Sequence, residues 1–359
     1  MKFNRKEPYN DLPLLPPKQD FYESLNIYKM LSKSRASLAE LKGRSPIIPN
    51  PLMLINTLVL QEARDSSTIE NIFTSNDKLY RAFALTRMEK DINTKEVLYY
   101  REALWHSYQI LKKNKVMDLD LVINIFQVIK GTNKEGIRKN QVWIDNGLIR
   151  VYSPPEPGKV LINKIKNWIE YENSNSIDPL IKMALLHYQF ESIHPFSDGN
   201  GRTGRILNVL YLCHKNLLDL PILYLSKYIL EHKIEYYRLF AEVTEHNKWE
   251  EWIIFMLKAV DETAKFTLAK VNSIYDLFKE TQEIVKGKAS DIYSYELVEL
   301  LFQQPYCKIS FLVEHKIASR NTASRYLNRL VNLGILERKE EGREVIYLNK
   351  RLYQVLLKS

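Results

Sequence analysis

The chain has 359 residues, of which 45% are hydrophobic and 26% charged, a composition that excludes disordered, collagen-like and low-complexity proteins. Its only two cysteines, Cys213 and Cys307, exclude a disulfide scaffold and a cysteine zinc finger, and a reducing, cytoplasmic setting is expected. The formal net charge of +9 is compatible with phosphate or nucleic-acid ligands, and equally with a lysine-rich proteome.

The chain length predicts two or three domains, at roughly 150 residues a domain. Its 11 glycines are about 3% of the residues, against a usual ~7%, which disfavours turn-dense all-β folds and favours helices. No apolar run approaches the roughly 20 residues of a membrane helix, so no membrane partner is expected. The first ten residues contain no apolar core of a secretory signal, so none is expected.

Helical spacing of apolar residues organises most of the chain. A proline-containing segment over 1–20 is expected to be extended, and prolines at 46–51 are expected to separate two helices. One segment differs: over 142–151, β-rich runs flank Asn146-Gly147, the strongest short hairpin signal. The spacing predicts helices over residues 22–43, 52 to about 70, 75–135, 161–173, 179–191, 202–215 and onward to about 286.

A linker at 287–290 is expected to precede a small C-terminal unit over 289–359. The unit shows three helical segments and then two strands around a charged turn, which is the order of a winged helix-turn-helix domain. The three helices are expected over 292–302, 309–315 and 321–333, and Gly334 ends the third. The two strands are expected within 335–348.

The third of these helices offers side chains suited to phosphates or base edges, so DNA is a candidate partner. The unit has 11 Lys and Arg against 8 Asp and Glu, so the basic surplus of the chain is not concentrated there. A protein-interaction or dimerisation role and a purely structural role remain open. The side chains in question are Arg320, Asn321, Thr322, Ser324, Arg325, Asn328 and Arg329.

The most informative stretch is the loop HPFSDGNGRTGR, residues 194–205, between two predicted helices. Successive backbone N–H groups in a glycine-rich loop before a helix form an anion site, and Arg202 and Arg205 add positive charge suited to phosphate. Asp198 is a hard oxygen ligand placed for Mg²⁺, and His194 is a base that titrates near neutral pH. Together these residue types predict phosphoryl-type transfer.

Two other nucleotide-binding patterns fail on this loop. The G-x-G-x-x-G match over 199–204 needs a preceding strand and a later acid within a βαβ unit. Here residues 181–188 have a helical pattern, and Asp219 belongs to no such unit. A Walker A loop also fails, because Arg205 follows Gly204 where that motif requires Lys.

The loop matches every fixed position of the Fic-domain signature H-x-F-x-[DE]-G-N-G-R-x-x-R, so the chain resembles the Fic family. The helices within 10–70 resemble the N-terminal extension common in bacterial Fic proteins. Residues 66–71 match the inhibitory-helix motif [ST]-x-x-x-E-[GN] through Ser66, Glu70 and Asn71.

The resemblance implies a mainly α fold: a Fic helical core with a β-hairpin flap, followed by the winged helix-turn-helix domain. Its expected domains are an N-terminal extension over 1–100 with an inhibitory helix at about 52–71, a Fic core over 101–286, and the C-terminal domain over 289–359. Within the core, the flap is expected at 142–151 and the catalytic loop at 194–205.

The resemblance further implies a protein adenylyltransferase that moves AMP from ATP to a Ser, Thr or Tyr hydroxyl of a target protein, the chain itself included. His194 would deprotonate the hydroxyl, and Asp198 would hold Mg²⁺. Phe196 is expected to anchor the loop in the core, and Tyr237 to contact the nucleotide, although helix packing is the ordinary role of such a tyrosine. The residues expected to bind ATP and its phosphates are Gly199, Asn200, Gly201, Arg202, Thr203, Gly204, Arg205 and Tyr237, with the Asn200 amide among the groups used.

In relatives the inhibitory glutamate pairs with the second arginine of the motif, so Glu70 is expected to pair with Arg205 and occupy the γ-phosphate site. Ser66 lies four residues earlier and shares that helical face. The alternative interpretation of this segment is an ordinary exposed helix end. The same glutamate is also suited to hydrolytic removal of AMP, so a deAMPylase is the alternative enzyme.

Other hypotheses remain open alongside these. The flap would offer a strand edge to an extended target segment, or it is an exposed hairpin without a partner. A nucleotide-sensing DNA-binding regulator is the alternative outside the enzymes, and a homodimer is implied by relatives. Some Fic relatives transfer UMP, phosphocholine or phosphate, but the intact Gly199-Asn200-Gly201-Arg202 favours AMP. His187 is expected to be a satisfied core histidine.

Overall fold

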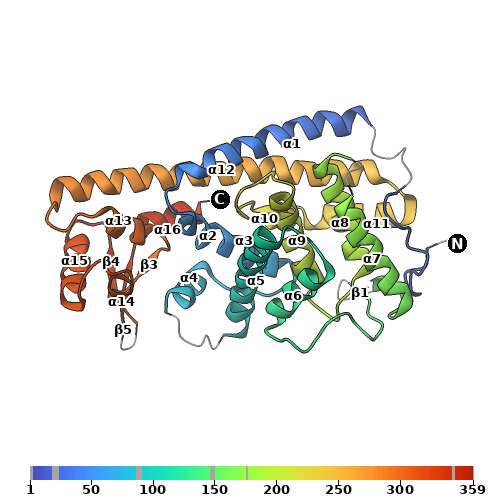
Figure 1. The fold of residues 1–359 in the computed structure, drawn as a ribbon, viewed down its shortest axis with the longest axis horizontal. Coiled ribbons are helices and arrows are strands. Elements are labelled where there is room, and N and C mark those ends of the chain that lie inside the picture. Colours follow the sequence, from blue (N-terminus) through green and yellow to red (C-terminus); the bar gives the residue numbers. More distant parts are fainter. Residues whose placement is uncertain are drawn as a thin grey trace.

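The computed structural model describes residues 3–17, 24–85, 91–145, 150–174, 177–341 and 344–358. Most of these residues are helical, and two long helices run side by side along one face (Figure 1). They are α1 (Leu25–Arg44) and α12 (Trp249–Lys288). The first predicted helix therefore exists, although its expected start at Tyr22 lies outside the described residues.

The centre of the molecule is helix α8 (Pro179–Ile193), which is buried from Leu180 to Ile193 and so has no solvent-facing side. It packs against α7 and α9 and against α12. Indole N–H groups of Trp168 and Trp252 each donate to a backbone carbonyl of α8, at 2.8 Å. This helix is therefore held from two sides, and the residue that follows it, His194, is held with it.

The other helices of the core surround α8 and α9. Their bounds are α5 (Ile92–Asn114), α6 (Leu119–Lys130), α7 (Lys159–Asn173), α9 (Asn200–His214), α10 (Leu225–Glu231) and α11 (Lys233–His246). The predicted helical run over 75–135 is wrong in part: Gly131, with φ of 62°, ends α6, and irregular backbone follows. Residues 86–90 of that run lie outside the described residues.

The single helix predicted from Leu52 to about Glu70 is also wrong. Two helices replace it, α2 (Pro51–Ile55) and α3 (Leu58–Ile69). Asn56 and the buried Thr57 lie between them, and the Thr57 hydroxyl donates to the carbonyl of Met53. A short 3₁₀ turn, η2 (Ser45–Ile47), precedes α2, and α4 (Asn76–Leu85) follows α3.

The predicted hairpin is present as two short antiparallel strands, β1 (Ile144–Asp145) and β2 (Arg150–Tyr152). Its Asn146-Gly147 turn lies outside the described residues. The N-terminal segment 3–17 lies against β2: the Phe3 ring stacks on Tyr152 at 5.7 Å, and the Tyr9 N–H donates to the Ser153 carbonyl.

The C-terminal unit contains the predicted three helices and hairpin, with the sheet order β3-β5-β4. The helix α16 and the strand β3 are additions that the sequence patterns did not predict, and the turn at 342–343 lies outside the described residues. The elements are α13 (Tyr295–Phe302), β3 (Tyr306–Cys307), α14 (Ile309–Glu314), α15 (Arg320–Asn332), β4 (Glu337–Glu341), β5 (Glu344–Leu348) and α16 (Lys350–Leu357).

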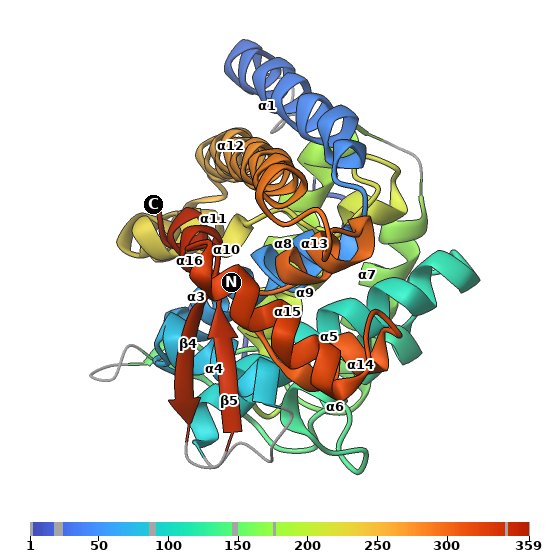
Figure 2. The same ribbon diagram turned by 90° about the vertical axis from the view of Figure 1, so that its left-hand side faces the viewer.

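A continuous helix joins this unit to the core, because α12 extends through Gly287 and Lys288, where a linker was predicted. Figure 2, viewed from that end, shows the unit in front of the core and α1 above α12. Helix α16 docks on two core helices: Lys270 of α12 donates to the Val355 carbonyl at 2.6 Å, and Gln61 of α3 donates to the Leu356 carbonyl.

The predicted fold class, mainly α with a small hairpin and a C-terminal winged helix, is confirmed. Within the described ranges, no helix combines the length and the apolar character that crossing a bilayer requires.

Candidate active site

The loop at 194–199 is shaped by two residues with left-handed backbone. His194, with φ of 50°, ends α8, and Gly199, with φ of 74°, begins α9. Phe196 is fully buried and stacks on Phe126 with ring centroids 4.1 Å apart. The expectation that Phe196 anchors the loop is therefore confirmed.

The side chain of Asn200 is buried and stabilises the loop through hydrogen bonds to its backbone. Its side-chain amide donates to the Phe196 carbonyl at 2.9 Å and accepts from the Phe196 N–H at 2.8 Å. Because the side chain is 1% exposed and engaged in this way, the expected contact between its amide and a phosphate is not formed by this arrangement. Its contribution is to hold the loop closed.

His194 has a defined tautomer. Its Nδ1 lies 3.1 Å from the backbone carbonyl of Glu191, and a carbonyl can only accept, so Nδ1 carries the proton. The basic nitrogen is then Nε2. Burial lowers the pKa of His194 to about 4, so the imidazole is neutral at pH 7 and able to take a proton.

Arg138, which the sequence patterns did not single out, ties the loop to its surroundings. Its side chain donates to the carbonyls of His194 at 2.8 Å, Asn140 at 3.2 Å, and Pro155. Its backbone N–H donates to the Pro195 carbonyl at 2.9 Å. No pattern in one sequence could identify this arginine, because it lies in irregular backbone and acts on main-chain atoms.

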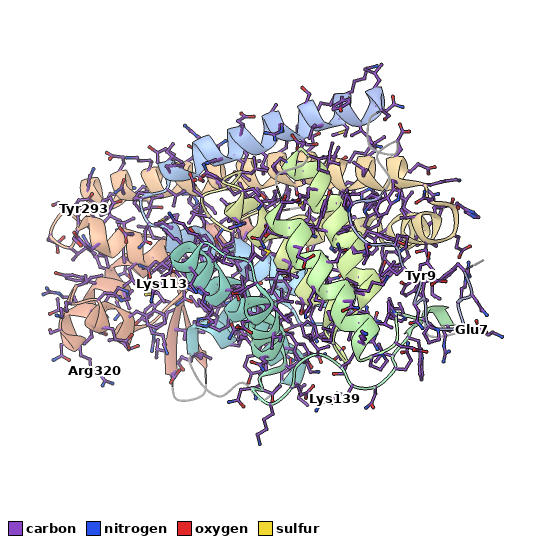
Figure 3. All side chains as sticks on the ribbon, turned by 45° about the vertical axis from the view of Figure 1, so that its right-hand side comes forward. Glu7, Tyr9, Lys113, Lys139, Tyr293 and Arg320 are labelled. Carbon is purple, nitrogen blue, oxygen red and sulfur yellow. The ribbon has the colours of Figure 1, made fainter. Side chains whose placement is uncertain are left out.

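Replacing Arg138 by methionine is expected to destabilise the loop. The carbonyls of His194, Asn140 and Pro155 would lose a donor, and the buried one, that of Pro155, would cost roughly 1–3 kcal/mol. We expect the thermal midpoint to fall by several degrees and nucleotide-dependent activity by about tenfold. The control is Lys139→Met, since the neighbouring Lys139 projects into solvent (Figure 3). Equal behaviour of the two variants would contradict this role of Arg138.

Arg205 is buried and makes the contacts expected of it. Its Nε donates to the Ser66 hydroxyl at 2.7 Å, and its Nη2 donates to the Ser66 carbonyl at 2.9 Å and to Glu70 Oε1 at 2.7 Å. Burial alone would lower the pKa of Arg205, but the neighbouring Glu70, Tyr100 and Glu191 together outweigh it and raise the pKa, so the guanidinium stays charged. Gly201 makes room for the Glu70 carboxylate, because a Cβ there would overlap Oε1.

Arg202 and Asp198 have partners from other helices. Arg202 Nη1 donates to Glu96 Oε2 at 2.8 Å, and Lys130 donates to Asp198 Oδ2 at 2.8 Å. Burial raises the pKa of Asp198, but Lys130, the Gly199 N–H and Arg202 together outweigh it, and the pKa lies below its ordinary value. The Asp198 carboxylate is therefore ionised and 64% exposed, as a Mg²⁺ ligand requires.

Two residues expected at the phosphates lie elsewhere. The Thr203 hydroxyl is buried and donates to the Gly199 carbonyl at 2.9 Å. Gly204 faces α8, where a Cβ would overlap Glu191 Oε1. Both lie within α9 and pack on its inner side, and neither lines the cavity with His194 and Arg205, so their contacts with phosphate stay predictions.

A cavity of about 80 Å³ brings together five of the predicted site residues, namely Glu70, His194, Gly201, Arg205 and Tyr237. It is far smaller than the roughly 300–1,000 Å³ of ordinary ligand sites, and the Glu70 carboxylate lies in it. Its walls come from the C-terminal end of α3, the hairpin, α8, α9 and α11. They are Glu70, Ile144, Val151, Tyr152, Glu191, His194, Gly201, Arg205, Tyr236, Tyr237 and Phe240.

The two tyrosines of α11 have different surroundings. Tyr236 is buried, and its hydroxyl lies 3.0 Å from Nε2 of His187. Tyr237 is 38% exposed at the cavity, where burial of its hydroxyl raises its pKa to about 12. Tyr237 therefore remains the candidate for nucleotide contact. His187 is a core residue as predicted, with burial lowering its pKa to about 3, but it is only half satisfied: Nε2 has the Tyr236 hydroxyl, and Nδ1 is buried without a hydrogen bond among the described residues.

Comparison with known families gives three matches along the chain. Residues 28–109 match the Fic/DOC family N-terminal model, and residues 116–212 match the Fic/DOC family model. Residues 277–352 match the C-terminal domain described as that of protein adenylyltransferase SoFic-like proteins.

Two similar curated proteins illustrate the relationship. "Probable protein adenylyltransferase aq_aa38" of Aquifex aeolicus is 34% identical over 184 residues, which cover 49% of this chain and 54% of that protein. "Protein adenylyltransferase Fic" of Drosophila mojavensis is 43% identical over 72 residues, 20% of this chain and 13% of that protein. The chain thus spans about half of the first relative and a small part of the second.

Solved structures share the fold. A Fic family protein from Desulfovibrio desulfuricans G20 has a TM-score of 0.57 at 19% identity, covering 92% of this chain and 98% of that one. Fic-1 from C. elegans has a TM-score of 0.54 at 19% identity, covering 68% of this chain and 74% of that one. With the family matches and the intact loop, these findings identify the relationship: the chain contains Fic/DOC family domains over residues 28–109 and 116–212.

Proposed function

We propose that this protein is a protein adenylyltransferase. It transfers AMP from ATP to a Ser, Thr or Tyr hydroxyl of a target protein, itself included, and Glu70 holds it inactive. The observation that carries the proposal is the 2.7 Å ion pair between Glu70 and Arg205 in the cavity that His194 lines. The printed names of the two curated relatives support the same activity.

In the proposed reaction His194 Nε2 accepts the proton of the target hydroxyl. The hydroxyl oxygen forms a bond to the α-phosphorus of ATP, and the bond from that phosphorus to the bridging oxygen of the β-phosphate breaks. Pyrophosphate leaves with the bonding electrons. The loop contributes backbone N–H groups and Arg205, since phosphoryl transfer depends mainly on positioning and charge stabilisation.

Asp198 is the residue we assign to Mg²⁺. Its ionised carboxylate fits a metal that usually takes one or two protein carboxylates together with substrate phosphates. Bound there, Mg²⁺ would neutralise charge on the phosphates. In the present arrangement Lys130 supplies the positive charge beside Asp198.

Further parts of the proposal rest on the family resemblance. The proposed domains are an extension over 1–100, a core over 101–286 and a C-terminal domain over 289–359. Within the core, a flap over 142–151 receives the target segment. The protein is further proposed to form a homodimer and to be located in the cytoplasm. Because the target is unidentified, self-modification is the practical assay.

The test is label transfer by the Glu70→Gly protein. With Mg²⁺ and ATP labelled at the α-phosphate, we expect label on protein in a denaturing gel. With ATP labelled at the γ-phosphate, we expect none. Label from the γ-position only would replace the proposal with phosphate transfer, and no label from either, on the protein itself or on added lysate, would overturn it.

Removal of AMP is a second candidate, favoured by the Glu70 carboxylate in the same cavity as His194. A hydrolase that uses Glu70 as its base would release AMP from a pre-adenylylated protein in the wild type and not in Glu70→Gly. Release by both variants, or by neither, would remove this candidate.

DNA binding is the third candidate, favoured by the exposed polar face of α15 in the C-terminal unit. Arg320, Arg325 and Arg329 are exposed, and Arg320 lies at the outer edge of the unit (Figure 3). A DNA-binding regulator would give a salt-dependent gel shift that survives His194→Ala and is lost in Arg320→Ala/Arg325→Ala. Without a shift at low salt, this candidate is removed.

A further inference from the structure

Glu191 is a buried carboxyl group that the proposed reaction does not use. It lies on α8, three residues before His194, and is 7% exposed. It lines the same cavity as His194, Glu70 and Arg205. Within the described residues its Oε1 has no hydrogen-bond partner. Burying an acceptor without a donor costs free energy of folding, so a functional explanation for the position of Glu191 is warranted.

Two glycines of α9 make room for the carboxyl groups of Glu70 and Glu191 beside the turn that carries Arg205, and Glu70 is the one in contact with that arginine. A Cβ at Gly201 would overlap Glu70 Oε1, and a Cβ at Gly204 would overlap Glu191 Oε1. Glycine is unfavourable inside a helix, yet both of these stand in the turn that carries Arg205. Each glycine thus admits one carboxyl group to the helix surface around this arginine.

The charged and titratable groups that face Glu191 come from four elements. They are Arg205 on α9, Glu70 at the end of α3, His187 and His194 on α8, and Tyr236 and Tyr237 on α11. Both histidines are neutral at pH 7, because burial lowers their pKa values to about 3 and about 4. Both tyrosines are neutral as well, because burial raises their pKa values. Arg205 is therefore the cation among these groups.

We propose that Glu191 is a positioning residue: it is the alternative counter-ion of Arg205, which takes over the guanidinium when Glu70 withdraws and thereby stabilises the uninhibited state. Two carboxylates compete for one guanidinium, and both cannot ionise beside it without repulsion. With Glu70 in place Glu191 is neutral, and with Glu70 withdrawn it ionises. This inference rests on the proposed function in that it assigns a regulatory partner to the same site.

The direction of the pH effect follows from this competition. Burial raises the pKa of Glu191 to about 8, with Arg205 acting against the rise and Glu70 adding to it. Raising the pH from 7 to 9 therefore ionises Glu191, which then competes with Glu70 for Arg205. The hold of Glu70 on Arg205 weakens as the pH rises.

The test measures ATP binding, so that it does not depend on whether AMP is transferred. All variants carry His194→Ala, and the Kd for ATP with Mg²⁺ is measured by calorimetry with and without Glu70→Gly. The ratio of the two Kd values reports how strongly Glu70 blocks Arg205. With Glu191→Gln we expect this ratio to rise about tenfold, because Glu70 loses its competitor.

The pH dependence provides the second readout. In proteins with Glu191 the ratio is expected to fall between pH 7 and pH 9, and with Glu191→Gln it is expected to stay constant. Glu191→Asp keeps an ionisable group, so its ratio should still fall between pH 7 and pH 9. This variant tests the inference if Glu191→Gln fails to fold. A residue that acts only through folding would change both Kd values equally and leave the ratio unchanged.

The matched control is Glu172→Gln, another buried carboxyl to amide change, which removes a 2.9 Å ion pair with Lys215 away from the cavity. Its ratio should equal that of the parent at both pH values. An unchanged or lower ratio with Glu191→Gln, or a parent ratio that is constant from pH 7 to pH 9, would overturn the inference. Failure of the label-transfer assay would overturn the proposed function alone.

Discussion

Replacing His194 by alanine in the Glu70→Gly protein is expected to reduce AMP transfer by about three orders of magnitude, within the range of general-base contributions. The Glu191 carbonyl fixes the tautomer by accepting from Nδ1, so Nε2 is the nitrogen that takes the proton. Alanine removes that acceptor and leaves the phosphate-binding part of the loop in place. The measurement is the initial rate of label transfer from α-labelled ATP, with the Kd for ATP determined separately.

The control for this variant is His315→Ala, since His315 is an exposed histidine of the C-terminal unit. It should leave the transfer rate of the Glu70→Gly protein unchanged. If His194→Ala retained more than a tenth of the rate, or lost ATP binding to the same extent, His194 would not be the base.

The low pKa of His194 also predicts the pH profile of that rate. Because burial lowers its pKa to about 4, the neutral form persists well below pH 6.5, the ordinary pKa of histidine. Protonation of His194 should therefore cause no loss of transfer between pH 8 and pH 6, and the loss should begin only below about pH 5. A midpoint near 6.5 that disappears with the His194 side chain would contradict this.

Replacing Glu70 by glycine is expected to raise AMP transfer by about 10- to 100-fold. Hydrogen bonds to charged groups contribute about 1.5–3 kcal/mol, and a phosphate must displace the Glu70 carboxylate to reach Arg205. Removing the carboxylate removes that competition. Glu70→Gln, which keeps the size and one acceptor but not the charge, should give an intermediate rate. Initial rates of label transfer at subsaturating ATP measure the effect.

Asn71→Gly is the matched control for Glu70→Gly. Asn71 has φ of 61°, a conformation that glycine adopts without strain, so the change adds a glycine at the end of α3 without touching the ion pair. Its transfer rate should stay at the wild-type level. If both glycine variants were equally active, loosening of the helix end rather than loss of the carboxylate would be the cause.

The contiguous part of the site could be predicted from the sequence because its chemistry lies in twelve consecutive residues. The pairing of Glu70 with Arg205 spans 135 positions, and only the family resemblance pointed to it. The partners Glu96, Lys130 and Glu191 were not predicted. They belong to no motif, and each meets the loop only through the packing of its helix, which residue spacing does not encode.

The errors in the fold have local causes. The predicted second helix is divided at Asn56 and Thr57, and the apolar spacing from Leu54 to Leu58 continues across this break without indicating it. Strand β3 has 2 residues and helix α16 has 8, both shorter than the windows in which periodicity is measured. Thr203 and Gly204 match the family loop by position, but their side of α9 faces the core.

Helix α3 is held at both ends by different parts of the protein. Near its beginning Gln61 donates to the backbone of α16, and at its end Ser66 and Glu70 accept from Arg205. Its 12 residues span about 18 Å, and a rigid helix of this length transmits a displacement. If a molecule that binds the C-terminal unit displaced α16, the residues that hold Arg205 would be displaced with α3, and by thermodynamic linkage its binding and the binding of a ligand at Arg205 would affect each other by the same factor.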